Sequence, residues 1–253
     1  MNKILFPEAD NEYIKAASEQ LTGIEPVLQK CEPIEAYERL RDGEVDAVVA
    51  GIDYSSRDII LAAKDVLGLE KPEVKLFTSL FVAVLPDGRK LILSDGATCK
   101  HPTVEQMCRI IELVHAAATK LLDDEPRLAM LSFSSFGSGG HDDTMELAQE
   151  AIRITRERHP EIKIDGEMQL DAAVNERIAA KKAPESEVAG KANVLIVPDI
   201  NAGNILYKSL EQFAGAKVAG PILLGFNKPI SDLSRGSTVE DILLTTECLN
   251  KLI

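Results

Sequence analysis

The chain has 253 residues, enough for one large or two small domains, and its formal net charge of −13 at pH 7 argues against a nucleic-acid or anionic-membrane surface. Its four Cys and four His lack the spacing of zinc ligands, so no metal is expected. The sequence has no apolar stretch of about 18 residues and its first eight residues lack a signal-peptide pattern, which predicts a cytoplasmic protein.

The first 70 residues alternate apolar runs with amphipathic segments, the pattern of strands and helices in an α/β protein. Ser55 or Ser56 is expected to cap the last helix of this part. Gly, Pro and charged residues interrupt the pattern at residues 68–73, where we place a domain boundary. In chain order, the expected elements are a strand over residues 3–6, helices over 11–21 and 34–40, a strand over 45–50 and a helix over 58–66.

The alternation continues through the middle of the chain. Residues 86–89, Pro-Asp-Gly-Arg, are a strong hairpin signal between two apolar runs. Residues 102–105, Pro-Thr-Val-Glu, are typical of a helix start. The expected elements are strands over 76–85 and 90–94, a helix from 102 to about 122, a strand over 128–133, a helix over 142–159, a strand over 162–164 and a helix over 171–182.

Residues 193–208 are expected to form a buried strand, a tight loop and a helix. The apolar run passes through Asn201-Ala202-Gly203-Asn204 into a helix that should begin near Ile205. Loops at the carboxyl ends of parallel strands are where open α/β sheets bind ligands. Asn and Gly tolerate left-handed backbone angles, so this loop can aim N–H groups into a cleft. For each residue alone, shaping a sharp turn is an equally good interpretation.

Residues 228–242 place Ser234-Arg235-Gly236 before a periodic apolar segment that predicts a helix from about residue 239. Ser237 or Thr238 is the expected N-cap, and Asp241 lies in the first turn. Arg is a two-pronged donor to phosphate and a helix N-terminus favours negative charge, so the run indicates an oxyanion site. The alternative is a capped turn with a surface Arg.

Together these two runs, with residues 220–225 (Gly-Pro-Ile-Leu-Leu-Gly) between them, resemble the phosphate acetyltransferase and phosphate butyryltransferase family. The resemblance covers about residues 74–246 in the family's order, and a weaker match lies at residues 5–12. The further matching segments are residues 129–134, 137–138, 165–173, 182–186 and 189–192.

The resemblance implies two α/β domains around a cleft, like the isocitrate and isopropylmalate dehydrogenases, with a truncated first domain. Residues 1–70 plus 232–253 would form the shortened N-terminal domain, and residues 71–231 the second domain, which carries most of the motifs. The implied activity is reversible transfer of an acetyl or other short-chain acyl group between acyl phosphate and coenzyme A. Coenzyme A is then a substrate with no tightly bound cofactor, the other small-molecule partners are acyl phosphate and inorganic phosphate, and the chain is expected to be a homodimer.

By the same resemblance, Asp241 matches the family's proposed general base, Arg235 its phosphate-contacting arginine and Ser234 the adjacent hydroxyl. A carboxylate near a thiol can remove its proton as the new bond forms. Without the family match, Asp241 is better explained as an acid that complements the helix dipole. Three further residues are expected as cleft-lining donors: Ser132, Ser134 and Asn204.

Two departures from the family pattern bear on coenzyme A binding. After residues 26–28 the family normally has a long segment, carrying one arginine that contacts coenzyme A, which is absent here. Leu61 stands where another such arginine is usual; Arg57, one helical turn earlier on the same face, is either its substitute or a solvated surface residue. A non-catalytic or regulatory homologue that binds an acyl phosphate or a coenzyme A-like ligand therefore remains the alternative function.

Overall fold

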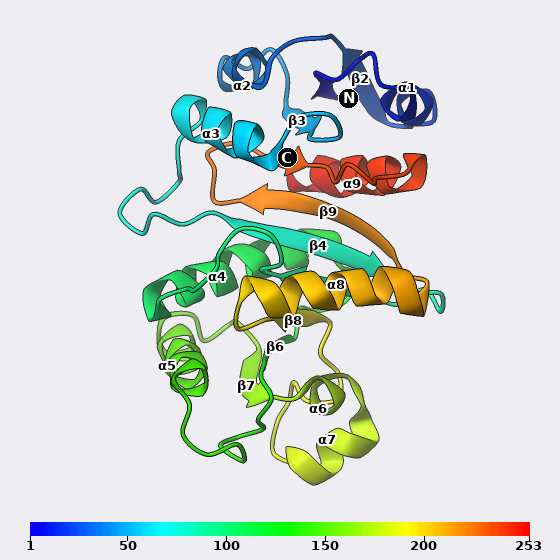
Figure 1. Cartoon of the computed structure of the whole chain (residues 1–253). Coiled ribbons are helices and arrows are strands. Elements are labelled where there is room, and N and C mark those ends of the chain that lie inside the picture. The colour runs from blue at the N-terminus through cyan, green and yellow to red at the C-terminus, as the bar shows by residue number, and fades with distance from the viewer. The chain divides into compact units, whose positions relative to one another are not determined.

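The computed structural model describes all 253 residues and confirms the α/β class. The chain divides into two compact units, unit 1 with Met1–Val82 and Lys217–Ile253, and unit 2 with Ala83–Ala216. In Figure 1, unit 1 carries the blue, cyan, orange and red parts of the ribbon and unit 2 the green and yellow parts. The boundaries expected from the sequence assign residues 71–82 and 217–231 to the second domain, whereas in the structure these residues lie in unit 1. The comparison with isocitrate dehydrogenase and the truncation of the first domain remain predictions.

Unit 1 has a sheet with the strand order β2-β1-β3-β10-β9-β4. β1 is parallel to β2 and β3, and β10 is parallel to β3, so these strands end at the same edge; β9 is antiparallel to β10. The strands are β1 (Asn2–Phe6), β2 (Ile24–Leu28), β3 (Ala47–Ala50), β4 (Thr78–Val84), β9 (Lys217–Leu224) and β10 (Ile230–Asp232).

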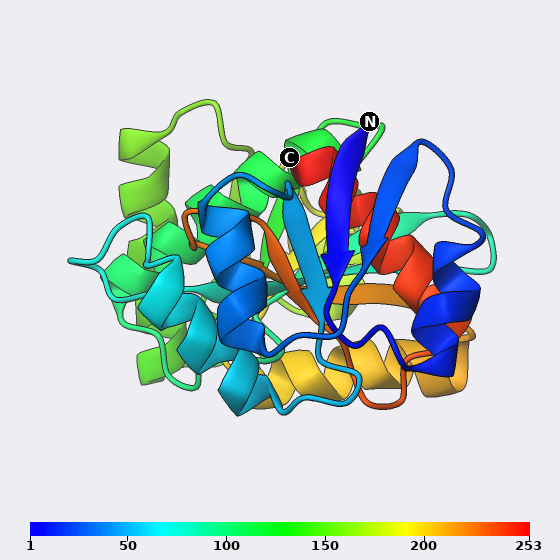
Figure 2. The ribbon, with the colours of Figure 1, turned by 90° about the horizontal axis from the view of Figure 1, so that it is seen from above.

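Four helices cover the sheet of unit 1: α1 (Glu12–Ser18), α2 (Pro33–Arg41), α3 (Ser56–Val66) and α9 (Val239–Leu252). Figure 2 shows α2 and α3 on one side of strands β1 and β3, and α1 with α9 on the other. The apolar stripe of α2 and α3 packs around the fully buried Tyr37 and closes the core on that side.

Unit 2 has four parallel strands in the order β5-β8-β6-β7. Its longest helices, α4 and α5, pack against each other. The strands are β5 (Lys90–Ser94), β6 (Leu128–Leu131), β7 (Ile164–Met168) and β8 (Val194–Ile196); the helices are α4 (Val104–Leu121), α5 (Asp143–Arg158), α6 (Leu170–Val174), α7 (Glu176–Lys182) and α8 (Ile200–Ala214). No helix of the structure combines the length and the apolarity that crossing a membrane requires.

The start of α8 differs from the prediction, because Asn201–Asn204 lie inside the helix and not in a loop before it. Asp199 is the N-cap, and its carboxylate accepts a hydrogen bond from the Ala202 N–H at 2.9 Å. Gly203 is helical and buried, and a Cβ at this position would stand 2.2 Å from the Asp95 carbonyl oxygen. The glycine therefore permits close packing of the helix and does not provide a left-handed turn.

The helix expected over residues 171–182 is divided into α6 and α7. Asn175 separates them, because its side-chain oxygen accepts hydrogen bonds from the N–H groups of Arg177 and Ile178 and so caps α7. An internal capping residue thus interrupts an otherwise continuous helical pattern.

Candidate functional site

The carboxyl ends of β1, β3 and β10 lie together at one edge of the sheet of unit 1. Ala50, the last residue of β3, pairs with Asp232, the last residue of β10. Beyond this pair, the Leu233 N–H donates to the Ala50 carbonyl at 2.6 Å, so the chain leaving β10 stays against the end of β3. Such an edge is the usual place for a ligand site in an open parallel sheet.

Glu8, just after β1, organises the loop that follows β3. Its carboxylate is buried, with only 6% of the residue exposed. It accepts four backbone hydrogen bonds, from Gly51 at 2.9 Å, Ile52 at 3.3 Å, Asp53 at 2.7 Å and Tyr54 at 2.7 Å. These donors are occupied by a protein carboxylate, so an anionic substrate at this edge must be bound by other groups.

Gly51 and Asp232 fit closely at the same edge. Gly51 has φ of +114°, and a Cβ there would lie 2.5 Å from Asp232 Oδ1, so only glycine is compatible with this contact. Asp232 is 5% exposed and its Oδ1 has no hydrogen-bond partner. Burial raises the pKa of Asp232 to about 6; the hydrogen bond from Ser56 opposes the rise, and the charge of Glu8 adds to it.

The raised pKa of Asp232 predicts a pH-dependent stability. Between the ordinary pKa of 3.8 and about 6, the native protein holds a proton that the unfolded chain has released. The free energy of unfolding should therefore fall as the pH rises through this window, because the native state is penalised once Asp232 is charged. Asp232→Asn should raise this free energy by about 1–3 kcal/mol near pH 7.5 and leave it unchanged near pH 4.

Chemical denaturation at both pH values measures this difference. Asp65→Asn, at an exposed position on α3, is the matched control and should have the same small effect at both. A gain for Asp232→Asn that is equal at the two pH values would contradict a shifted titration.

Ser234 and Arg235 form an exposed turn directly after β10. The Ser234 carbonyl accepts from the Ser237 N–H at 2.9 Å, and the Ser234 hydroxyl accepts from the Gly236 N–H at 3.3 Å. Arg235 is exposed and forms no hydrogen bond or ion pair within the chain. Its guanidinium is therefore available to an anion at the carboxyl edge of unit 1.

Asp241 belongs to the N-terminal cap of α9. Its Oδ2 accepts hydrogen bonds from the backbone N–H and the hydroxyl of Thr238, both at 2.8 Å. The Thr238 hydroxyl in turn accepts from the Asp241 N–H at 3.2 Å, which completes a capping box. Asp241 therefore has a structural role in the cap of α9, and only its Oδ1 atom is left for a role in proton transfer.

Arg57 lies in the first turn of α3, whose N-cap is Ser55. Because α3 follows β3, and β3 is the parallel neighbour of β10, Arg57 and Arg235 both follow strands that end at the same edge. The side chain of Arg57 is exposed and unpaired, and Leu61, one turn later, is 47% exposed. Arg57 can therefore supply a second cation at this edge.

In unit 2, acidic residues also follow the carboxyl ends of the parallel strands. Asp95, after β5, accepts from the N–H groups of Ala97 at 2.9 Å and Thr98 at 3.0 Å. The Asn204 amide, on α8, donates to the Gly96 carbonyl at 3.3 Å. This contact holds Asn204 to the loop after β5 and uses one of its two N–H donors, so its expected role as a substrate donor stays a prediction.

Ser134, also expected to line a cleft, is buried and hydrogen-bonded within unit 2. Its hydroxyl donates to Glu167 at 2.9 Å and accepts from the Gly139 N–H at 2.9 Å. Burial acts to raise the pKa of Glu167, but hydrogen bonds from Gly137, Gln149 and Ser134 outweigh it, so the pKa is lowered and the carboxylate stays charged. Ser132 is half-buried and its hydroxyl accepts from the Ser134 N–H at 3.3 Å, which leaves its own proton to donate.

Comparison with known proteins identifies the family of this chain. The family model described as phosphate acetyl/butaryl transferase matches residues 11–247. The chain belongs to this family. The resemblance seen in the sequence is confirmed.

Relatives in the phosphate acetyl/butyryl transferase family are similar over most of the chain. The phosphate acetyltransferase of Clostridium acetobutylicum is 42% identical over 209 residues, which is 81% of this chain and 62% of that protein. That of Treponema pallidum is 41% identical over 211 residues, with the same two shares. This chain thus spans less than two thirds of the length of these relatives. A phosphotransacetylase structure from Streptococcus pyogenes superimposes with a TM-score of 0.88 and 27% identity, covering 99% of this chain and 94% of that one.

Four buried acids of this family member received no role from the sequence: Glu8, Asp95, Asp165 and Glu167. Glu8 and Asp95 each follow the end of a strand, within one or two residues of an apolar run, and that position is a signal that the sequence offers. Their partners are not visible in it, because the contacts are made by loops. The chain holds no group of three or more His, Cys, Asp or Glu side chains arranged for a metal ion.

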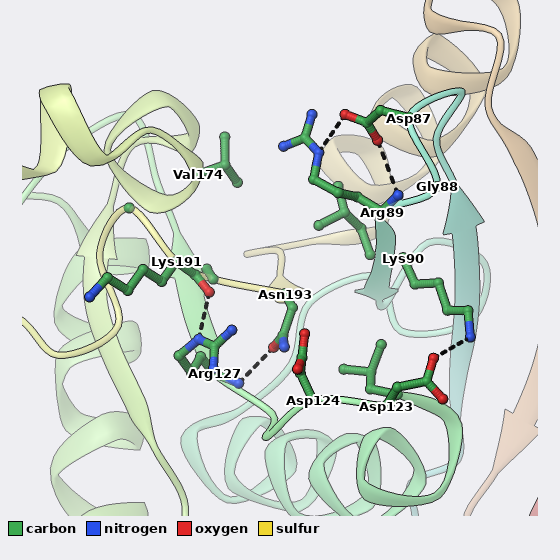
Figure 3. Close-up of a pocket in the computed structure, with 14 residues that line it drawn as sticks. Asp87, Gly88, Arg89, Lys90, Asp123, Asp124, Arg127, Val174, Lys191 and Asn193 are labelled. Atoms are coloured by element: carbon green, nitrogen blue, oxygen red, sulfur yellow. Dashed lines mark hydrogen bonds and ion pairs between the residues drawn. The ribbon is translucent and has the colours of Figure 1, made fainter.

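A pocket of about 480 Å³ lies at the opposite edge of unit 2, beside the amino ends of β5, β6 and β8 (Figure 3). Its basic residues are largely engaged: Arg89 with Asp87 at 2.7 Å, Lys90 with Asp123 at 2.8 Å, and Arg127 Nε with the Lys191 carbonyl at 2.7 Å. In Figure 3 the Lys191 ammonium points away from Arg89 and Lys90. These cations do not converge on one anion, so this pocket is not the candidate site.

Proposed function

We propose that this chain transfers a short acyl group reversibly between acyl phosphate and coenzyme A. The observation that carries the proposal is the Ser234-Arg235 turn, whose unpaired guanidinium stands at the carboxyl edge of a parallel sheet in a member of this family. In a chain with a net charge of −13, an unpaired arginine at that edge provides a local positive charge that attracts phosphate. The same charge would repel anionic substrates from most of the surface.

The proposed reaction joins the coenzyme A sulfur to the acyl carbon and breaks the bond between that carbon and the phosphate oxygen. The thiol proton passes to a base, for which Oδ1 of Asp241 is the proposed atom. Arg235 and the Ser234 hydroxyl stabilise the negative charge on the phosphate and on the tetrahedral oxyanion. No covalent acyl-enzyme is needed, because holding both substrates in place supplies a large part of the rate.

Arg57 is the proposed contact for the phosphates of coenzyme A, and Ser132 is a proposed substrate donor. Coenzyme A acts as a substrate, with acyl phosphate and inorganic phosphate as the other small molecules and no tightly bound cofactor. A cytoplasmic homodimer is the proposed form of the protein. Ile205 and Phe213 on α8, exposed by 67% and 90%, support an oligomer because a second copy can cover them.

Thioester formation tests the proposed function. The chain should form acyl-CoA from coenzyme A and acetyl, propionyl or butyryl phosphate. In the reverse direction it should form acyl phosphate from acyl-CoA and inorganic phosphate. Ultraviolet absorbance of the thioester follows both directions, with reactions lacking protein as the background. If the rate stays at that background with every acyl phosphate, the proposed enzymatic activity is refuted.

A non-catalytic homologue is the second candidate, because Asp241 is already used in the α9 cap and the exposed Leu61 stands where the resemblance implies an arginine. That candidate predicts binding of acyl phosphate or coenzyme A by calorimetry without turnover.

A further inference from the structure

Asp232, the last residue of β10, is buried against the loop that leaves β3 and is bonded to the start of α3. Its Oδ1 atom lies against Gly51, where a Cβ would be only 2.5 Å away, and has no hydrogen-bond partner. The hydroxyl of Ser56, the first residue of α3, therefore donates to the other carboxylate oxygen, Oδ2. One oxygen thus faces the loop after β3, and the other holds α3.

The hydrogen bond from Ser56 to Asp232 joins the two segments that carry the proposed cations of unit 1. Ser56 directly precedes Arg57 in the first turn of α3, and Asp232 stands three residues before Arg235. All four residues belong to unit 1. This link between segments distant in the chain therefore fixes how the start of α3 lies relative to the end of β10.

The two ends of the link are held unequally. On the β10 side, the chain is also bonded to the end of β3, because the Leu233 N–H donates to the Ala50 carbonyl at 2.6 Å. On the α3 side, the N–H groups that Glu8 binds end at Tyr54, and the Ser55 cap bonds within the first turn of the helix itself. Loss of the link should therefore move the start of α3 more than the turn after β10.

The link has a cost in stability. Burial raises the pKa of Asp232 to about 6, so the group is charged at neutral pH, and a buried carboxylate with an unpartnered oxygen is unfavourable. Destabilising polar groups and shifted pKa values are concentrated at functional sites, where the position of a group matters more than the stability of the fold. This cost indicates that Asp232 has a role beyond holding the sheet together.

We propose that Asp232 is a positioning residue, which through Ser56 holds Arg57 at a fixed place relative to the Ser234-Arg235 turn, so that coenzyme A bound by Arg57 meets the acyl phosphate bound by Arg235. The inference rests on the proposed function. A misplacement of about 1 Å at a substrate contact can cost up to about a hundredfold in rate. Because Arg57 is proposed to contact coenzyme A and not the acyl phosphate, the loss should fall on the KM for coenzyme A.

Ser56→Ala is the deciding variant, because it removes the donor and leaves Asp232 in place. It should raise the KM for coenzyme A about five- to tenfold and change kcat and the KM for acetyl phosphate by less than about twofold, the pattern expected when a contact common to the ground state and the transition state is weakened. Ser56→Thr keeps a hydroxyl and should keep the wild-type KM. Asp232→Asn keeps an oxygen that accepts from Ser56, so it should also keep this KM although its stability changes.

Ser18→Ala is the matched control. The Ser18 hydroxyl donates to the Lys15 carbonyl at 2.7 Å at the C-terminal end of α1, which Figure 2 shows on the other side of strands β1 and β3 from α3. Its removal should lower the melting temperature about as much as Ser56→Ala does and leave the KM for coenzyme A unchanged. An equal rise of this KM in both variants would mean a general loosening of unit 1 and would overturn the positioning role.

The outcomes separate the positioning role from the proposed reaction. Turnover with an unchanged KM for coenzyme A in Ser56→Ala overturns the role and leaves the proposed function standing. A loss of kcat of about 10²-fold or more in Asp232→Asn also overturns it, because that loss is typical of a base. If no acyl phosphate is turned over, the proposed function fails, and calorimetry with coenzyme A alone tests the link. Weaker binding by Ser56→Ala than by Ser56→Thr then supports the link; equal affinities, or no binding by the wild type, overturn it.

Discussion

Replacing Asp241 by asparagine is expected to lower kcat by about 10²–10⁴-fold, the usual contribution of a general base. The carboxamide keeps the shape of the side chain and can still accept the Thr238 N–H bond of the α9 cap, but it does not take up the thiol proton. Activity should recover in part as the pH rises, because a thiol with a pKa near 8.5 then ionises without help. Steady-state rates across pH for the wild type, Asp241→Asn and Asp241→Glu provide the measurement, and the Glu variant should retain some activity.

Thr238→Val is the matched control for this experiment. It removes the hydroxyl that both donates to Asp241 and accepts from its N–H, at a cost of about 0.5–2 kcal/mol in the free energy of unfolding, and it leaves the carboxylate in place. Slow turnover in Asp241→Asn with near-normal turnover in Thr238→Val supports a base. Wild-type turnover in Asp241→Asn, or an equal loss in both variants, assigns Asp241 to the helix cap and makes Asp232 the next candidate.

Arg235→Ala should lower kcat by about 10²–10³-fold, the typical loss when one group that stabilises an oxyanion is removed. Because Arg235 is exposed and unpaired, its removal should change the free energy of unfolding by less than about 0.5 kcal/mol. Arg235→Lys should restore only part of the rate, since an ammonium lacks the planar two-pronged donor. Kinetics and thermal melting of the same preparations separate the two effects.

Arg41→Ala is the control for removal of a positive charge from unit 1, because Arg41 is an exposed arginine at the C-terminal end of α2, paired only with Asp42. It should leave kcat unchanged. Full activity in Arg235→Ala would place the site elsewhere on the molecule.

Local features of the chain were accessible from the sequence alone. The helix caps at Ser55 and Thr238 were among the expected residues, because capping depends on a side chain and an N–H group three residues apart. The alternation of strands and helices followed from the spacing of apolar residues along the chain, which is also a local property. The family followed from the order of several short motifs along one chain, which a sequence displays directly.

The roles of the individual site residues depended on partners distant in the sequence. Ser134 donates to Glu167, 33 residues later, and Asn204 donates one N–H to Gly96, 108 residues earlier, and neither contact can be read from the local sequence. The start of α8 was misplaced because Asp199 caps the helix and Asn201–Asn204 are helical; the close packing of Gly203 on Asp95 is a contact absent from any local pattern. Glu8 occupies N–H groups more than 40 residues away, and Asp232 has a raised pKa because the fold buries it. Propensity and period act over a few residues, whereas burial and hydrogen-bond pairing arise only when distant segments meet, so the tertiary structure decided which polar groups are free for chemistry.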